Sequence, residues 1–339
     1  MIIDAAELKR RYLQRIAGVR DKKAYIGPEI IALDINNSCN LSCQYCWTHA
    51  PGNLAHFEKA RFFPWKKFLG IVCDSVDLNV DEFHITGSGE PTIHPSFRDM
   101  MRHLEQQPFN VKLFTNATFP LDYCSDVIKG DRVVIDLSAV ERQQYRDLQG
   151  KDLFDRVVAN IERLVSLRDA GKPGFIIEIV YIVNIVNINQ KQKMQELALR
   201  LGVNSVYFKK MNVHAYNQEI ALPESSIRSE EKRTPPACLN GWFYLIVKSE
   251  DVNTSTCCRI PRMPFGDLDQ WSLKQFWLSP QMMNMRLLGK YGRIQKMYKA
   301  CQTCPSYDEN IRRVQTLVGQ EKMSRPLPSD ITIEITNHC

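Results

Sequence analysis

Strand-length apolar runs alternate with amphipathic segments along the first two thirds of the chain, and this alternation constrains the fold more than any other feature. Six strand candidates occur between residues 30 and 210: Ile30–Ile35, Glu82–Thr86, Val111–Thr115, Val133–Leu137, Phe175–Val183 and Ser205–Lys209. Stretches with helical periodicity separate them, among them Trp65–Val76, Ser96–Glu105, Leu153–Ala170 and Lys191–Leu201. This alternation predicts a parallel sheet with right-handed crossovers. We therefore expect an α/β fold, a partial (βα)6 TIM-like barrel, with the active site at the carboxyl ends of its strands.

The regions outside the barrel predict further units. The 339 residues suffice for one large domain and one small domain. Residues 1–29 are expected to form an N-terminal helical segment, and residues 30–221 the barrel. Residues 237–323 are expected to form a small C-terminal α+β module, joined to the barrel by a polar, proline-containing stretch. Its predicted elements are a hairpin of Trp242–Lys248 and Thr254–Cys257, and helices over Leu273–Leu278 and Gln281–Leu288.

A short repeat links the two ends of the chain. Residues 31–39 read IALDINNSC and residues 331–339 read ITIEITNHC, and the two peptides share four of nine residues. Residues 324–339 are therefore interpreted as a linker followed by the start of a second, truncated domain of the same kind as the barrel, ending on Cys339. Chance similarity between two strand-like peptides is the alternative.

Charge and hydropathy narrow the cellular setting. No apolar run is long enough to cross a bilayer, and the N-terminus lacks the apolar core of a signal peptide. We therefore expect a cytoplasmic protein without a membrane partner. The net charge of +6 is spread without a dominant basic run, so it does not argue for nucleic-acid binding and suits an anionic small substrate equally well.

The eleven cysteines point to metal or cluster binding, because disulfides are rare in chains without an export signal. The segment CNLSCQYC places Cys39, Cys43 and Cys46 directly after the first predicted strand. Three thiolates can hold a 4Fe–4S cluster and leave one iron open for chemistry. A zinc site completed by His49 or His56 is the alternative. Cys73 and Cys124 lie in apolar contexts and are expected to be small buried side chains.

The cysteine segment resembles the radical SAM superfamily, whose motif is C-x3-C-x2-C with an aromatic residue before the last cysteine. Tyr45 occupies that aromatic position. The resemblance implies that the open iron chelates the amino and carboxylate groups of S-adenosylmethionine (SAM). One electron from the cluster would then cleave SAM and yield a 5′-deoxyadenosyl radical. It also implies that Tyr45 lies against the adenine.

A second segment, Thr86–Pro95, looks like the GGEP motif with which this superfamily contacts the SAM amino group. Gly87, Ser88, Gly89 and Glu90 are the implied cofactor-binding residues, with Ser88 in place of a glycine. Glycines allow a ligand to approach the backbone, and the Glu90 carboxylate suits an ammonium group. Further polar or apolar candidates near strand ends are Thr115, Asn116, Asp136, Ser138, Asn184 and Met211. Whether Asp136 or Ser138 meets SAM stays open at this point.

The later cysteines resemble the SPASM or twitch extension of radical SAM enzymes. Cys238, Cys257, Cys301 and Cys304 would supply four thiolates for one auxiliary 4Fe–4S cluster in the C-terminal module. Cys258 could replace Cys257 as a ligand, and a structural zinc on the same four thiolates is the alternative.

Together these resemblances imply a radical SAM oxidoreductase or maturase, in which the auxiliary cluster accepts an electron from the substrate. The reaction would be an oxidation or a cross-link. The substrate would be a small molecule or a peptide, and the short segment before the first strand favours a small molecule. An external one-electron donor such as a flavodoxin or ferredoxin is also implied. The alternative is an iron–sulfur or zinc-binding scaffold protein without turnover.

Overall fold

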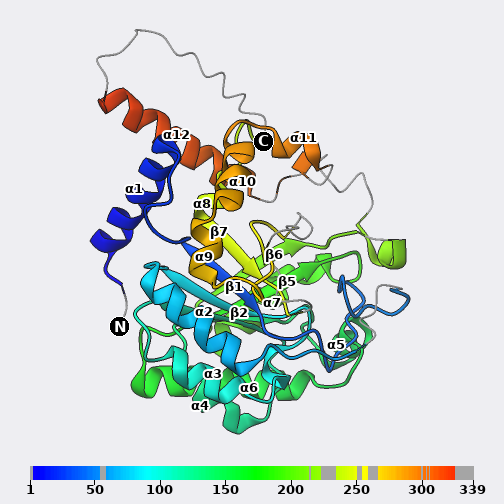
Figure 1. Ribbon diagram of the computed structural model, residues 1–339. Coiled ribbons are helices and arrows are strands. Elements are labelled where there is room, and N and C mark those ends of the chain that lie inside the picture. Colours follow the sequence, from blue (N-terminus) through cyan, green and yellow to red (C-terminus); the bar gives the residue numbers. More distant parts are fainter. Residues whose placement is uncertain are drawn as a thin grey trace.

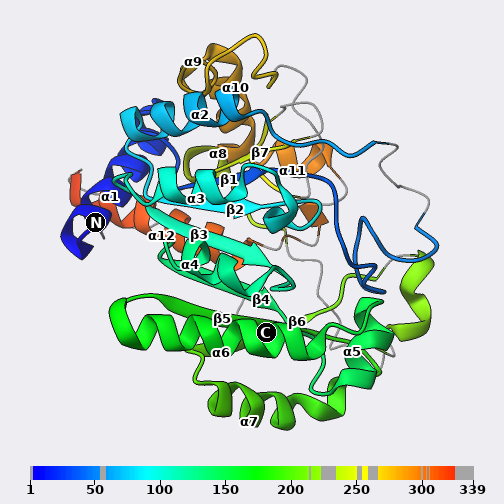
Figure 2. The ribbon, with the colours of Figure 1, turned by 90° about the horizontal axis from the view of Figure 1, so that it is seen from below.

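The computed structural model describes residues 3–53, 59–213, 215–222, 234–249, 254–258, 266–298, 301–302, 304 and 306–324. Its centre is one sheet with the strand order β6-β5-β4-β3-β2-β1-β7-β8 (Figures 1 and 2). The strands are β1 (Ile30–Asp34), β2 (Glu82–Thr86), β3 (Asn110–Thr115), β4 (Arg132–Asp136), β5 (Ile176–Val183), β6 (Ser205–Lys210), β7 (Tyr244–Val247) and β8 (Thr254–Ser255). All neighbouring pairs are parallel except β7 and β8. The predicted α/β fold and its six barrel strands are confirmed.

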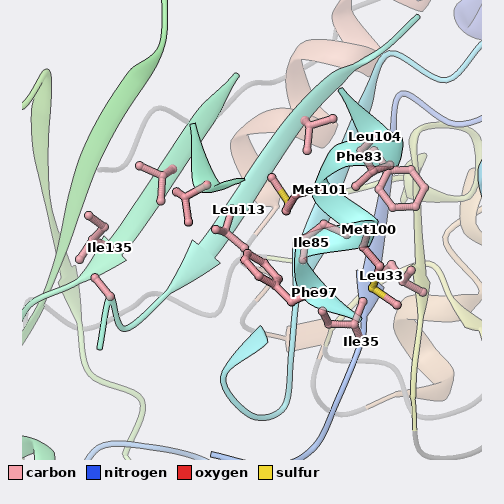
Figure 3. Close-up of a cluster of buried hydrophobic side chains, with 14 of the residues drawn as sticks. Leu33, Ile35, Phe83, Ile85, Phe97, Met100, Met101, Leu104, Leu113 and Ile135 are labelled. Carbon is pink, nitrogen blue, oxygen red and sulfur yellow. The ribbon is translucent and has the colours of Figure 1, made fainter. Parts of the chain in front are cut away.

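Helices follow the strands along one face of the sheet. They are α2 (Trp65–Asp77), α3 (Phe97–Leu104), α4 (Cys124–Val127), α5 (Arg142–Gln149), α6 (Phe154–Gly171) and α7 (Lys191–Leu201). Figure 3 shows how this layer packs, with Leu33, Ile85 and Leu113 of three neighbouring strands facing side chains of α3. These residues alternate with others along each strand, because successive side chains of a strand point to opposite faces. The large apolar core therefore lies between the sheet and its helices.

The opposite face of the sheet lines the inside of the open barrel. It carries charged side chains near the amino ends of the strands. The Arg132 guanidinium lies 3.4 Å from the Glu178 carboxylate, and the Tyr207 hydroxyl donates to the same carboxylate at 2.8 Å. His84 and Glu82 lie 2.6 Å apart on β2. Since these charges pair with one another, this layer of the interior is electrostatically satisfied without a ligand.

The expected hairpin of the C-terminal module is continuous with the barrel sheet. Strand β7 pairs in parallel with β1, and β8 pairs with β7. The predicted strand Trp242–Lys248 starts too early, because Asn240–Phe243 forms a short helix, α8. Trp242 is buried beside the N-terminal helix, and its indole N–H donates to the Lys23 carbonyl at 2.9 Å. Tertiary packing thus overrides the β-propensity of these aromatic residues.

The N-terminal helix packs on the last helix of the chain. Helix α1 (Ala5–Asp21) lies beside α12 (Tyr307–Ser324) in both views (Figures 1 and 2), and Ile16, Val19 and Leu317 share one apolar cluster with α8. The other C-terminal helices are α9 (Leu273–Leu278), α10 (Pro280–Lys290) and α11 (Ile294–Met297). The domain boundaries stay predictions, and residues 331–339 with their repeat lie outside the described residues. Within those residues, no helix combines the length and apolar character that spanning a bilayer requires.

The two isolated cysteines have different environments. Cys124 is buried at the start of α4, as expected. Cys73 is exposed, so the expectation of burial is wrong for it. Phe68, Ile71 and Val72 form the buried side of α2, and Cys73 lies on the side that faces away from the sheet. An apolar neighbourhood in the sequence does not reveal which side of a helix a residue occupies.

A buried ion pair should contribute strongly to stability. The Arg15 guanidinium lies 2.5 Å from the Asp81 carboxylate, and both side chains are buried where α1 meets the barrel. Asp81→Asn leaves the buried cation without its counter-charge, so we expect the free energy of unfolding to fall by about 3 kcal/mol in urea titrations. Asp21→Asn, which breaks the more exposed pair with Arg20, should cost less than about 1 kcal/mol. Equal losses in the two variants would contradict this assignment.

Candidate active site

A cavity of about 380 Å³ opens at the carboxyl ends of β1 to β6, where the barrel fold predicts an active site. The three cysteines of the CNLSCQYC segment line it, together with Tyr45, the turn Gly87–Glu90, Thr115, Asn116, Asp136, Lys209 and Lys210. The structure therefore brings together residues that six different strands deliver. Ser138, Asn184 and Met211, which the sequence also nominated, do not line the cavity.

The cysteine segment is fixed at both ends by hydrogen bonds. The Asn40 amide donates to the Thr118 hydroxyl at 2.7 Å and accepts from the Asn116 amide at 3.0 Å, so the loop is attached to the end of β3. The Gln44 backbone N–H donates to the Leu148 carbonyl at 2.9 Å, which attaches the other half of the loop to the end of α5. Two separate anchors thus hold the three thiols over the cavity.

The turn after β2 is held by a buried carboxylate. Asp34, at the end of β1, accepts hydrogen bonds from the Ser88 backbone N–H at 2.9 Å and from the Ser88 hydroxyl at 2.5 Å. The Thr48 hydroxyl donates to the Ser88 carbonyl at 2.8 Å and lies 3.1 Å from the Cys46 sulfur. The serine that departs from the family motif therefore has a defined partner, and it ties the turn to the cysteine loop.

Gly89 allows the turn to approach the cysteine loop closely. Its neighbour Glu90 donates its backbone N–H to the Ser38 carbonyl at 2.7 Å. A Cβ atom built on Gly89 would lie 1.8 Å from that carbonyl oxygen, so no other residue fits without moving the backbone next to Cys39. Here the glycine is required by packing of backbone against backbone.

The Glu90 carboxylate accepts hydrogen bonds from several groups of the protein. It accepts from the Thr92 backbone N–H and hydroxyl, from the Thr115 hydroxyl at 2.5 Å and from the Asn116 backbone N–H at 2.7 Å. Burial raises the pKa of this carboxyl, and these hydrogen bonds oppose the increase. Since a carboxylate has about four acceptor sites, Glu90 mainly joins the turn to β3. Its contact with an ammonium group stays a prediction.

Asp136, rather than Ser138, meets the cavity. The Tyr45 hydroxyl donates to Asp136 Oδ1 at 3.1 Å, and the Ser138 hydroxyl donates to the same atom at 2.9 Å. Ser138 is fully buried and also accepts from the Ile182 backbone N–H, so it positions Asp136 from behind. Burial raises the pKa of Asp136 to about 6, although the Ser138 and Tyr45 hydrogen bonds favour its ionised form.

The donor set fits an iron–sulfur cluster. Burial raises the pKa of Cys39 to about 12 and raises that of Cys43 as well, and nearby thiols and carboxylates add to both increases. Metal coordination would release these protons. Within the described ranges, no three His, Cys, Asp or Glu side chains form a group that could hold one metal ion. A 4Fe–4S cluster would bind each of the three thiolates to a different iron, and zinc with His49 stays the alternative. His56 lies outside the described residues.

The second cysteine set is partly assembled. Burial raises the pKa of Cys238 to about 11, and the nearby Cys304 and Cys301 thiols contribute to that increase. Cys257 and Cys258 lie close to Tyr244 of β7, whose pKa is raised mainly by burial and further by these two thiols. The Cys238 thiol thus lies near enough to the Cys301 and Cys304 thiols to interact with them electrostatically, and their role as ligands stays a prediction. The place of Cys257 in this set, and the choice between it and Cys258, stay predictions.

Several structural roles escaped sequence reasoning. Asp34 lies inside a predicted strand, and only the fold shows that its side chain reaches the next loop. Asn36 donates to the Glu90 carbonyl at 2.9 Å, and Thr48 follows the last cysteine by two residues. Asn184 hydrogen-bonds within its own loop, and Met211 packs against Tyr45 and Leu148 beneath the cysteine segment. In the sequence, the only sign of these roles was that Asp34, Asn36 and Thr48 are polar residues close to the cysteine segment.

The fold and the site define a class of protein, an open α/β barrel with three cysteine thiols at the carboxyl ends of its strands. Residues 33–189 match the family model of the radical SAM superfamily, so this part of the chain is similar to that superfamily's domain.

The chain is also similar to curated proteins in part of its length and to solved structures in its fold. A probable GTP 3′,8-cyclase of Saccharolobus islandicus (strain Y.N.15.51) is 26% identical over 184 residues, which are 53% of this chain and 56% of that protein. The chain thus spans about half the length of the curated relatives it matches. SuiB of Streptococcus suis bound to S-adenosylmethionine has a TM-score of 0.63 at 13% identity, over 92% of this chain and 81% of that chain. Native anSMEcpe with bound AdoMet has a TM-score of 0.58 at 14% identity, over 86% and 99%. At these identities the structures show a shared fold.

The close approach at Gly89 can be tested by adding one methyl group. Gly89→Ala should push the turn away from Ser38 and disturb the cysteine loop, so the variant should lose most of its iron on anaerobic reconstitution. Gly70→Ala is the matched control, because an added Cβ in the middle of α2 meets nothing within 4 Å. Iron and sulfide quantitation measures the difference. Full iron loading of Gly89→Ala would show that the contact is not needed.

Proposed function

We propose that this protein is a radical SAM enzyme in which Cys39, Cys43 and Cys46 hold a 4Fe–4S cluster and the adjoining cavity binds SAM. The observation that carries the proposal is that the three thiols and the Gly87–Glu90 turn line one cavity and are hydrogen-bonded to each other's loops. When bound, the cluster and SAM together supply one-electron cleavage of SAM and a 5′-deoxyadenosyl radical.

The residues of the chain position SAM and limit its freedom. Gly87, Ser88 and Gly89 expose backbone to the amino-acid end of SAM, and Tyr45 provides an aromatic surface for the adenine. Asp136 has Tyr45 and Ser138 as donors on Oδ1, which leaves Oδ2 for a donor on SAM. Apolar side chains of Phe114, Val134, Val180 and Ile182 complete the wall and exclude water. Such a lining protects a reactive radical from stray hydrogen donors.

We also propose that Cys238, Cys257, Cys301 and Cys304 hold an auxiliary 4Fe–4S cluster of the SPASM or twitch type. The proximity of the Cys238, Cys301 and Cys304 thiols supports it. Four thiolates close the coordination of the cluster, so its role here is to accept an electron from the substrate. The reaction is then an oxidation or a cross-link, with an external one-electron donor such as a flavodoxin or ferredoxin for the first cluster.

The names of similar proteins indicate two classes of substrate, small molecules and peptides. The curated names contain GTP, a small molecule, whereas SuiB has been solved with a precursor peptide, SuiA. We propose a small-molecule or peptide substrate for this chain. The second candidate function is a cluster or zinc scaffold without turnover, and the assays below separate it from an enzyme.

Cys43 should be indispensable for SAM cleavage. With SAM and dithionite under anaerobic conditions, the reconstituted protein should release 5′-deoxyadenosine, and Cys43→Ala should release none because the SAM-binding cluster is lost. Cys73→Ala is the matched control, since that thiol is exposed on α2 and does not line the cavity. Liquid chromatography measures the nucleoside. A natural protein that holds zinc and releases nothing would support the scaffold alternative.

The variant Cys304→Ala should distinguish the roles of the two proposed clusters. The natural chain should bind about eight irons, in two four-iron clusters, and Cys304→Ala about four. The variant should still cleave SAM, because its first cluster is intact, and it should form no oxidised product. Iron quantitation and nucleoside release can be measured before the substrate is known. An unchanged iron content in Cys304→Ala would refute the auxiliary cluster.

A further inference from the structure

Lys209 brings a positive charge to the wall of the cavity. It lies near the end of β6 and pairs with Ile182 of β5 in the parallel register. Both Lys209 and Ile182 line the cavity. Since Val180 pairs with Asp136 and with Tyr207, Lys209 lies one inward-facing position above the level of Asp136, toward the mouth.

This ammonium group has no ion-pair partner in the part of the chain that the structure describes. Among the described residues, Lys209 forms no hydrogen bond and no ion pair, and its side chain is exposed. Below it in the barrel, Arg132 is paired with Glu178. Glu90 is surrounded by its four donors. Lys209 acts on Asp136 through space, since it favours the ionised form of that carboxyl, yet the two are not in contact.

SAM does not supply the missing anion. Its sulfonium and ammonium groups outnumber its one carboxylate, so it adds positive charge to the cavity. By the resemblance to radical SAM enzymes, that carboxylate would be held at the open iron of the cluster bound by Cys39, Cys43 and Cys46. A negative group near Lys209 must therefore come from the second molecule that enters the cavity, which is the substrate.

We propose that Lys209 binds a phosphate or carboxylate group of the substrate, so that the substrate of this enzyme is an anion. This inference rests on the proposed function, because it concerns the same cavity with SAM in place. A lysine acts as a point charge for either anion, and its three N–H donors can turn to meet the oxygen atoms. Lys209 is then the residue that selects charged over neutral substrates.

The test measures anion binding to the reconstituted, SAM-loaded enzyme by anaerobic calorimetry. Two probes distinguish the chemistries: inorganic pyrophosphate represents a phosphate group and succinate a carboxylate. At least one should bind, and Lys209→Gln should weaken that binding by about tenfold to a hundredfold, as expected for loss of a charge-assisted hydrogen bond. Lys209→Arg should retain most of it. Lys193→Gln, on the exposed side of α7, is the matched control and should bind like the natural chain.

Three outcomes would overturn the proposal. Neither probe binds, or Lys209→Gln binds the probe as well as the natural chain does, or SAM and the probe displace each other. The last result would make Lys209 the partner of the SAM carboxylate. Release of 5′-deoxyadenosine, measured on the same samples, reports separately on the proposed function. Its absence alongside Lys209-dependent anion binding would refute SAM cleavage and leave an anion site.

Discussion

The site depends on one backbone contact, in which the turn after β2 lies directly against the loop after β1. The Glu90 N–H donates to the Ser38 carbonyl, and the absence of a side chain on Gly89 lets the two chains meet. Parallel pairing of β1 with β2 brings the two loops to the same edge of the sheet. The three thiols and the predicted SAM-binding turn then share one cavity because their loops have no freedom to separate.

Buried carboxylates organise this region. Asp34 takes donors from Ser88, Glu90 from β3 and its own turn, and Asp136 from Tyr45 and Ser138. An unpaired polar group in such a place would cost several kcal/mol, so each acid positions the groups that satisfy it. Because the acids are largely occupied by the protein, Lys209 near the end of β6 leaves positive charge at the cavity wall for a ligand.

The C-terminal part extends the barrel sheet and returns to the N-terminus. Strand β7 pairs with β1, and α12 packs on α1. The Leu239 N–H donates to the Asn310 side chain at 2.7 Å, and the Cys238 N–H to the Gly289 carbonyl at 2.9 Å. The segment that carries Cys238 is thus held by α10 and by α12, which begins three residues after Cys304. This arrangement explains how thiols more than sixty residues apart, on Cys238 and Cys304, come near each other.

The sequence alone determined the α/β class, the six barrel strands and the cysteine segment, because these depend on local periodicity and on spacing within a few residues. It also placed Gly87–Glu90 beside the cysteines, since parallel strands share an edge. Only the tertiary structure decided that Asp136 and not Ser138 faces the cavity, that Cys73 is exposed and that Trp242 is helical. It also decided that Lys209 forms no ion pair with any residue that the structure describes. Each of these depends on which residues distant in the chain become neighbours, and periodicity carries no information about such neighbours.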